Sequence, residues 1–325
     1  MNKAKPLLIL LTKLLVSAGL LAFFFTQIHF ERFLSTLAGA NFGYVAAALV
    51  VYLATQLASA IRWGILARPL GFDTSYKDLG IYYLIGMFFN LFAPSTVGGD
   101  VSRVYYLARD GEKERGQGWA TATVPAAVSV FMDRAVGMAV LLWLGAIGLA
   151  LFPYYAVPSA IRSLTFALSL ALVAGVLLVP ALRRVLPEDG HPIVVKLRLA
   201  MRAYHTQWGV LPQAILVSFA IHLVQAWMHL LIGKALQINV PFSFCIILYP
   251  LAGTFAALPF SLNGLGLREG AYLFLLGLIG ITPEKGIAFG LLLFLIVVVD
   301  SLIGGVLFLM KRSPKPSADA LTSLT

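Results

Sequence analysis

The sequence predicts an all-α polytopic membrane protein, with six transmembrane helices and two re-entrant helical hairpins arranged as an inverted repeat. Of its 325 residues, 60% are hydrophobic and only 12% are charged, about half the charged fraction of soluble domains. Several apolar runs reach the roughly 20 residues that cross a bilayer as a helix, and they are too long for barrel strands. Two apolar blocks also contain proline, glycine and charged residues, which a simple spanning helix has no reason to carry.

The composition also excludes several classes of protein. The net charge of +10 could indicate nucleic-acid binding, but Lys and Arg gather in the cytoplasmic loops of membrane proteins, so we expect no nucleic-acid partner. The single cysteine, Cys245, excludes an internal disulfide and a cysteine metal cluster. The sequence contains no acyl-transfer triad, phosphate-binding loop, zinc-protease motif or dinucleotide fingerprint. We therefore expect neither a cofactor nor a metal, and no catalytic residues.

The first span is expected at residues 7–26. Lys3 and Lys5 precede this run as they would in a signal sequence. The run has the length of a span and no small-residue cleavage site follows it directly, which favours an uncleaved first helix. A short loop is expected at 27–40, and polar loops at 109–118 and 181–211. The other spans are expected at 42–66, 120–151, 161–179, 212–235 and 287–310.

The two interrupted blocks predict the re-entrant hairpins, at 79–109 and 242–280. In the first, helical arms flank a turn at 94–100, and in the second they flank a turn that begins at Pro259. Each arm is too short to cross the bilayer alone. Irregular backbone at membrane depth is tolerated only where protein buries it or where it lines a wet cavity.

The distribution of basic residues predicts the orientation. If the hairpins do not cross the membrane, the N-terminus and the regions around Arg68, Lys113, Arg184 and Lys311 lie on one side. By the positive-inside rule that side is the cytoplasm, so both termini are expected to be cytoplasmic in an inner membrane. Hairpins that cross fully would leave the same charge pattern, so this alternative stays open.

The order of the elements predicts two membrane repeats, 1–151 and 152–312, followed by a polar cytoplasmic tail at 313–325. Three crossings in each half would invert the second repeat. The two hairpin tips would then approach one another near the midplane. Opposed broken helices in an inverted repeat are a sequence pointer to a transport site.

The first hairpin supplies candidate binding residues. The helix after Gly98 and Gly99 begins with Asp100 and has Arg103 one turn later, and Asn90 is a polar residue on the preceding arm. A helix start presents free N–H groups to an anion, and a guanidinium can bind phosphate bidentately. The structural alternative is that Asp100 caps its helix and pairs with Arg103.

The second hairpin supplies a similar set. Asn263, Gly264 and Gly266 form the turn, and the next helix begins with Arg268 and Glu269. These residues are candidates for a second half of a phosphate-binding cradle inside the membrane. The structural alternative is that Glu269 only neutralises Arg268.

Three further charged residues lie inside predicted spans, where charges are costly and are often functional. Asp133 and Arg134 are adjacent, so we expect each to reach a different group, in the site or in a structural ion pair. Asp300 has no basic neighbour in sequence. It is a candidate for balancing Arg134 or Arg103, or for carrying a proton.

Three other polar residues are expected at the interface or in the core. Arg62 is interpreted as an interfacial residue, with contact to a headgroup as the alternative. His222 and His229 lie seven residues apart, on one helical face. Without a third ligand, such a pair is more typical of a core or an interface than of a metal site.

The segments Gly98-Gly99-Asp100…Arg103 and Asn263-Gly-Leu-Gly-Leu-Arg268-Glu269-Gly270 resemble the flippase-like transmembrane family. This family comprises the membrane part of the lysylphosphatidylglycerol synthetases and many stand-alone relatives, and the resemblance covers nearly the whole chain. Asp133-Arg134 falls where the family tends to place a Glu-Arg or similar pair, although the acid here is Asp. Because the chain ends at Thr325, without room for the aminoacyltransferase domain, that activity is not carried over.

The resemblance implies translocation of a lipid between leaflets, with a phospholipid or a polyprenyl-phosphate-linked sugar as cargo. The expected partners are lipids with anionic headgroups, and a homo-oligomer or a lipid-modifying enzyme partner is compatible with the sequence. Two alternatives stay open: a membrane enzyme that acts on a lipid phosphate, and a non-transporting scaffold for a lipid-modifying or glycosyltransferase partner. The sequence specifies neither the lipid nor the direction and energy source of transport.

Overall fold

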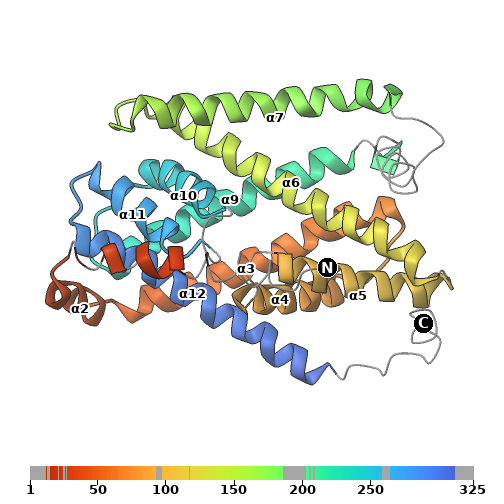
Figure 1. Ribbon diagram of the computed structural model, residues 1–325, viewed down its shortest axis with the longest axis horizontal. Helices are drawn as coiled ribbons and strands as arrows, with labels where there is room; N and C mark the ends of the chain where they lie inside the picture. Colours follow the sequence, from red (N-terminus) through yellow and green to blue (C-terminus); the bar gives the residue numbers. More distant parts are fainter. Residues whose placement is uncertain are drawn as a thin grey trace.

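The protein folds into a bundle of helices of very different lengths (Figure 1). The computed structural model describes residues 12, 15–20, 22–24, 26, 28–92, 97–116, 118–185, 203–204, 206–207, 209–257 and 264–311. All the regular secondary structure in these ranges is helical. The predicted all-α class is therefore confirmed.

Within the described residues, four helices are long and apolar enough to cross a membrane: α3 (Phe42–Ala67), α6 (Trp119–Leu151), α9 (Val210–Ala235) and α12 (Pro283–Met310). A fifth long helix, α7 (Ser159–Val185), is apolar over Ser159–Gly175. Most of the predicted first span lies outside the described residues, and those described at 15–20 and 22–24 are helical. The chain is a multi-pass membrane protein, and its division into six spans stays a prediction.

Each interrupted block forms a pair of shorter helices that pack side by side. The first pair is α4 (Tyr76–Phe92) with α5 (Val97–Arg115), and the second is α10 (Phe242–Ala256) with α11 (Leu267–Gly277). These helices have 17, 19, 15 and 11 residues, against the roughly 20 that a spanning helix needs. Whether the pairs are re-entrant stays a prediction.

Three local expectations were wrong. The expected loop at 27–40 contains a helix, α2 (Phe30–Ala38), which buries Phe33. Helix α5 continues to Arg115, through most of the polar segment expected to be a loop, because Arg, Glu and Lys are good helix formers. The expected turn at 94–100 is also too long, since α5 begins at Val97 and includes Gly98, Gly99 and Asp100 in its first turn.

The same packing relations recur in the two halves of the chain. Helix α4 packs against α12 and α10 packs against α6, while α5 packs against α6 and α11 packs against α12. Helices α3 and α9, which hold the same place in each half, pack along one another. Matched partners of this kind are what an inverted repeat would produce, and the division into two repeats stays a prediction.

The hydrophobic core forms a cluster around each helical pair. One cluster gathers Trp63, Leu79, Leu107 and Ala126 from α3 to α6. The larger one gathers buried residues of α9 to α12, among them Phe244, Met228 and Phe289. A polar cavity takes its lining from helices of both halves.

Candidate functional site

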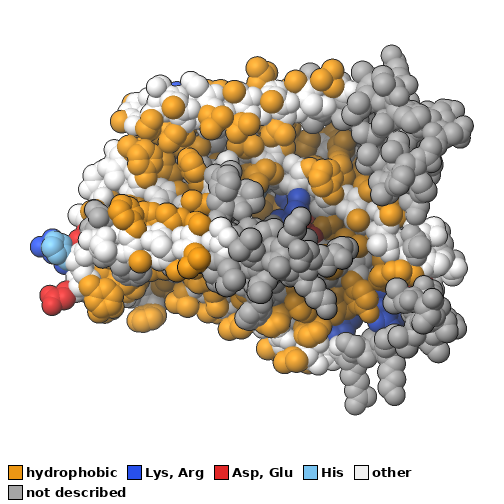
Figure 2. Space-filling model, viewed as in Figure 1, with side chains coloured by type: hydrophobic (Ala, Val, Ile, Leu, Met, Phe, Trp, Pro, Cys, Tyr) orange, Lys and Arg blue, Asp and Glu red, His pale blue; other side chains and the backbone are white. Residues whose placement is uncertain are grey.

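A cavity of about 710 Å³ lies among eight helices of the bundle, α3 to α7, α9, α10 and α12. This volume falls in the range of small-molecule pockets. Figure 2 shows basic and acidic side chains at the base of a hollow in this face, with hydrophobic side chains around it. Five charged residues line the cavity in the described part of the chain: Arg62, Asp100, Arg103, Asp133 and Arg134.

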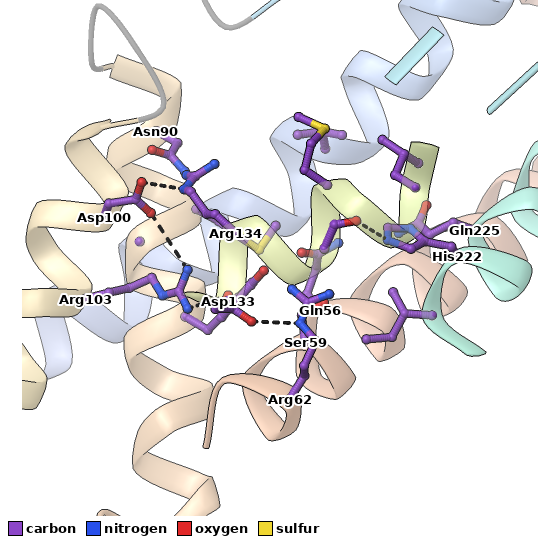
Figure 3. A pocket seen from close by; sticks show the side chains of 18 of the residues that line it. Gln56, Ser59, Arg62, Asn90, Asp100, Arg103, Asp133, Arg134, His222 and Gln225 are labelled. Carbon is purple, nitrogen blue, oxygen red and sulfur yellow. Dashed lines mark hydrogen bonds and ion pairs between the residues drawn. The ribbon is translucent and has the colours of Figure 1, made fainter. Parts of the chain in front are cut away.

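Asp133 of α6 is the centre of the charged network (Figure 3). Its Oδ1 accepts a hydrogen bond from Nε of Arg62 at 2.8 Å, and its Oδ2 accepts one from Nη2 of Arg103 at 2.7 Å. Nη1 of Arg62 also donates to Ser218 of α9 at 3.0 Å. Because both oxygens of a buried carboxylate are paired with arginine, this ion triad links α3, α5, α6 and α9.

Arg62 is therefore not the interfacial residue that the sequence was taken to indicate. Its side chain is buried and bonded to Asp133. Gly137 of α6 leaves room for it, since a Cβ there would lie 3.1 Å from Nη1 of Arg62. The signal available in the sequence was the position of Arg62 within an apolar run, before the span ends at Ala67.

Two aromatic rings hold the guanidinium of Arg103. Its Cζ lies 4.3 Å from the ring centroid of Trp63 and 4.5 Å from that of Tyr83. The indole N–H of Trp63 donates to Ser129 at 3.1 Å, which fixes the orientation of the ring. Stacking of this kind suits the planar guanidinium of Arg and not the ammonium of Lys.

A second acidic residue, Asp100, lies beside this triad. It pairs through Oδ2 with Nε of Arg134, and its Oδ1 is 3.8 Å from Nη1 of Arg103. The adjacent residues Asp133 and Arg134 thus engage different partners. The side chain of Arg134 is 41% exposed, whereas that of Arg103 is 6% exposed. Arg134 therefore occupies the more accessible edge of the network.

The network leaves polar atoms without partners. Within the described ranges, Nε of Arg103 and Oδ1 of Asp100 are buried and make no hydrogen bond. Unsatisfied buried polar groups are rare and costly in native proteins. A ligand with an anionic oxygen and a hydrogen-bond donor would satisfy both atoms. Three arginines against two aspartates also give the described lining a net charge of +1.

Asn90 and Gly99 bring α4 and α5 close together beside this network. Oδ1 of Asn90 accepts a hydrogen bond from the N–H of Gly99 at 2.8 Å, and so occupies one of the free donors at the start of α5. A Cβ at position 99 would lie 2.2 Å from the carbonyl oxygen of Gly86. Only glycine allows this approach. Gly98 lies in the same turn, and neither glycine is among the described lining residues.

The opposite wall of the cavity is polar but uncharged. Nε2 of His222 is 2.9 Å from the carbonyl oxygen of Gly137, and its Nδ1 is 2.8 Å from the hydroxyl of Tyr249. A carbonyl only accepts, so Nε2 donates to it and the neutral ring accepts from Tyr249. Gln225 donates to Thr55 at 2.6 Å. The sequence interpretation placed His222 in the core or an interface and overlooked Gln225, Tyr249 and Thr55.

The chain matches the family model described as the lysylphosphatidylglycerol synthase TM region over residues 10–304. The chain belongs to this family. A UPF0104 membrane protein of Methanocaldococcus jannaschii is 28% identical over 98 residues, which is 30% of this chain and 29% of that protein. The match thus spans less than a third of that relative's length.

The second helical pair is arranged differently from the first. Oε2 of Glu269 accepts from the N–H of Gly266 at 2.6 Å, and Oε1 accepts from Nη2 of Arg268 at 2.9 Å. The arginine also lies over the ring of Phe294, at 5.0 Å from its centroid. Glu269 thus occupies the helix start and neutralises the arginine, which is the alternative that the sequence left open.

These second-pair residues are not among the described residues that line the cavity. Gly264 and Gly266 have φ values of 77° and 86°, in the left-handed region that glycine adopts without strain. Asn263 lies outside the described residues, as does part of each predicted hairpin tip, at 94–96 and 259–262. The predicted meeting of the tips is therefore not addressed by the described part of the chain.

Asp300 balances neither Arg134 nor Arg103, which are paired with Asp100 and Asp133. It is buried in α12, next to Ser301, which lines the cavity. His229 bonds Tyr272 at 2.6 Å and the carbonyl oxygen of Gln225. Within the described ranges, no group of three or more His, Cys, Asp or Glu side chains is placed to hold a metal ion.

Proposed function

We propose that this protein is a lipid transporter of the cytoplasmic membrane, which translocates a phosphate-bearing lipid between leaflets. The observation that carries the proposal is the buried arginine–aspartate network at the cavity, in which Nε of Arg103 has no hydrogen-bond partner among the described residues. Membrane proteins rarely bury such charges without a functional reason.

The charge and geometry of the network suit a lipid phosphate. A phosphodiester carries one negative charge, which matches the net +1 of the described lining. Its oxygens would accept from Nε of Arg103 and from Arg134, whose side chain is 41% exposed. Arginine binds phosphate through charge-assisted, often bidentate hydrogen bonds. A donor on the rest of the headgroup would satisfy Oδ1 of Asp100.

The apolar part of the lining suits the remainder of the lipid. Phe131, Met138 and Leu172 line the same cavity, and the side chain of Phe131 is 68% exposed. A headgroup at Arg103 could therefore leave its acyl tails along these residues and in the bilayer. The matched packing of the two halves supports movement of one repeat against the other, as in transporters built from inverted repeats.

The test is leaflet exchange of fluorescent phosphate-bearing lipids in liposomes, with phosphatidylglycerol, phosphatidic acid and a polyprenyl phosphate as probes. The wild type should exchange at least one of them faster than protein-free liposomes. Arg103→Ala should abolish this exchange. Arg109→Ala is the matched control, because Arg109 is on the same helix, donates to the hydroxyl of Tyr105 at the surface, and is not among the described residues that line the cavity.

Exchange that Arg103→Ala leaves intact would contradict the assignment of the site. If no probe is exchanged but the purified protein alters a lipid phosphate chemically, the protein is an enzyme. If neither occurs and Arg103→Ala retains function in cells, the scaffold alternative is correct.

A further inference from the structure

The carboxyl group of Asp300 is buried without a counter-charge. Its residue is 3% exposed and the neighbouring Ser301 is 1% exposed. Oδ2 of Asp300 and Oγ of Ser301 have no hydrogen-bond partner in the described part of the chain, and no ion pair to Asp300 is found there. These two residues are adjacent on one helix, and Ser301 lies at the cavity wall. Buried polar atoms are rarely left without a hydrogen-bond partner, so a partner that the described residues do not supply is expected here.

The contrast with Asp133 defines what Asp300 lacks. Both acids lie in long helices that hold the same place in the two halves, α6 and α12. Asp133 receives hydrogen bonds from two arginines, whereas Arg268, the basic residue of the second pair, bonds Glu269 instead. An ionised carboxylate without such partners is expensive to bury. Once the excess positive charge of the nearby cavity is neutralised, the least costly partner for Asp300 is a proton.

The described groups around Asp300 do not supply the positive charge that two arginines supply to Asp133. Tyr52 of α3 is within electrostatic range of both Asp300 and Arg268, but a phenol is neutral. The other buried titratable or charged side chains on helices packed against α12 have partners of their own, and the charged residues of α2, Glu31 and Arg32, are exposed. These partnered groups are Arg62 of α3, His222 and His229 of α9, and Arg268 and Glu269 of α11, while Tyr82, Tyr83 and Tyr272 are phenols.

Charge balance gives this proton a role. With Asp300 ionised, the three arginines of the cavity are balanced by three carboxylates, so a bound phosphate would leave one excess negative charge. With Asp300 protonated, the network and one phosphodiester are balanced. We propose that Asp300 is a proton-binding site that takes up one proton from solution for each lipid phosphate bound at Arg103 and Arg134. This inference rests on the proposed lipid transport and deepens it.

Asp300 lies directly beside the cavity wall along α12. Ser301 is the next residue of this helix, and it lines the cavity. A hard divalent cation is a poorer occupant, because such ions take six or more oxygen ligands and this position offers one carboxylate and one hydroxyl.

The test is proton uptake by the purified protein when it binds short-chain phosphatidylglycerol. The sample is weakly buffered and contains a pH indicator, and lipid binding is measured in parallel from mildly acidic to mildly alkaline pH. At the pH where proton uptake is largest, the wild type should take up about one proton per lipid bound. Asp300→Asn should bind the lipid without uptake. Glu284→Gln, which changes another buried acid of α12, should show uptake like the wild type.

In liposomes that exchange the lipid, a pH gradient should accelerate exchange by the wild type and by Glu284→Gln, but not by Asp300→Asn. A sodium gradient should accelerate none of them. Lipid binding by the wild type without proton uptake, or equal uptake by Asp300→Asn, would overturn this inference and leave the transport proposal standing. Absence of both binding and exchange for every phosphate-bearing probe would overturn both.

Discussion

Arg103 and Asp133 form a buried ion pair between α5 and α6, with Nη2 of the arginine 2.7 Å from Oδ2 of the aspartate. The same carboxylate bonds Arg62 on α3, so one side chain joins three helices at the cavity wall. This arrangement orients Arg103 and leaves its Nε without a hydrogen-bond partner among the described residues.

The first prediction concerns stability. Asp133→Asn leaves the buried Arg62 without a counter-charge and leaves Arg103 with only Asp100, 3.8 Å away. Removal of one partner of a buried ion pair typically lowers the free energy of unfolding by about 3–5 kcal/mol. We expect a clear fall in the midpoint of thermal unfolding in detergent. Asp73→Asn, at an exposed position, serves as the control. An unfolding midpoint for Asp133→Asn equal to that of the control would show that the network contributes no net stability.

The second prediction concerns the shape of the cation. Arg103→Lys keeps the charge but loses the planar contact with Trp63 and Tyr83 and the fork of donors. Lipid exchange should fall by at least about tenfold, the factor that corresponds to about 1.4 kcal/mol. Arg109→Lys, on the same helix, should exchange lipid like the wild type. Wild-type rates for Arg103→Lys would mean that only the charge at this position matters.

A third prediction concerns the close approach of α4 and α5. Gly99→Ala would place a Cβ 2.2 Å from the carbonyl oxygen of Gly86 and 2.6 Å from Oδ1 of Asn90. The helices must separate, so we expect a loss of about 1–3 kcal/mol in stability and reduced exchange. Gly175→Ala meets nothing within 4 Å and should stabilise α7 by up to about 1 kcal/mol. Thermal unfolding of the two variants, compared side by side, checks this. Equal midpoints would contradict the tight contact.

The sequence predicted the helical class and most helix positions because long apolar runs have few alternatives in a membrane. It also identified Asp100, Arg103, Asp133 and Arg134, since charges inside apolar runs are conspicuous. It did not predict their pairing: Arg62 was assigned to the interface, yet it completes the triad with Asp133. Which side chains meet depends on the packing of α3 against α6 and α9, and no local pattern encodes that packing.

The sequence also did not predict the contacts of the second helical pair. Arg268 and Glu269 follow a glycine-rich turn much as Asp100 and Arg103 follow Gly98 and Gly99, so similar sequences suggested similar roles. In the structure Glu269 turns back onto the N–H of Gly266 and onto its neighbour Arg268. The difference arises from the order of acid and base along the helix. Likewise, α2 was overlooked because a helix of nine residues is too short to stand out between two long apolar runs.

Phosphate recognition at the cavity is tested most directly by comparing two fluorescent lipids with identical tails. One is phosphatidylglycerol, and the other is a glycosyl diacylglycerol that lacks phosphate. Both are followed in the same liposomes that contain the wild-type protein. If the cavity recognises phosphate, the phosphate-bearing lipid should exchange faster, and Arg103→Ala should lose this preference. Equal exchange of the two lipids, or a preference that survives Arg103→Ala, would contradict phosphate recognition at this cavity.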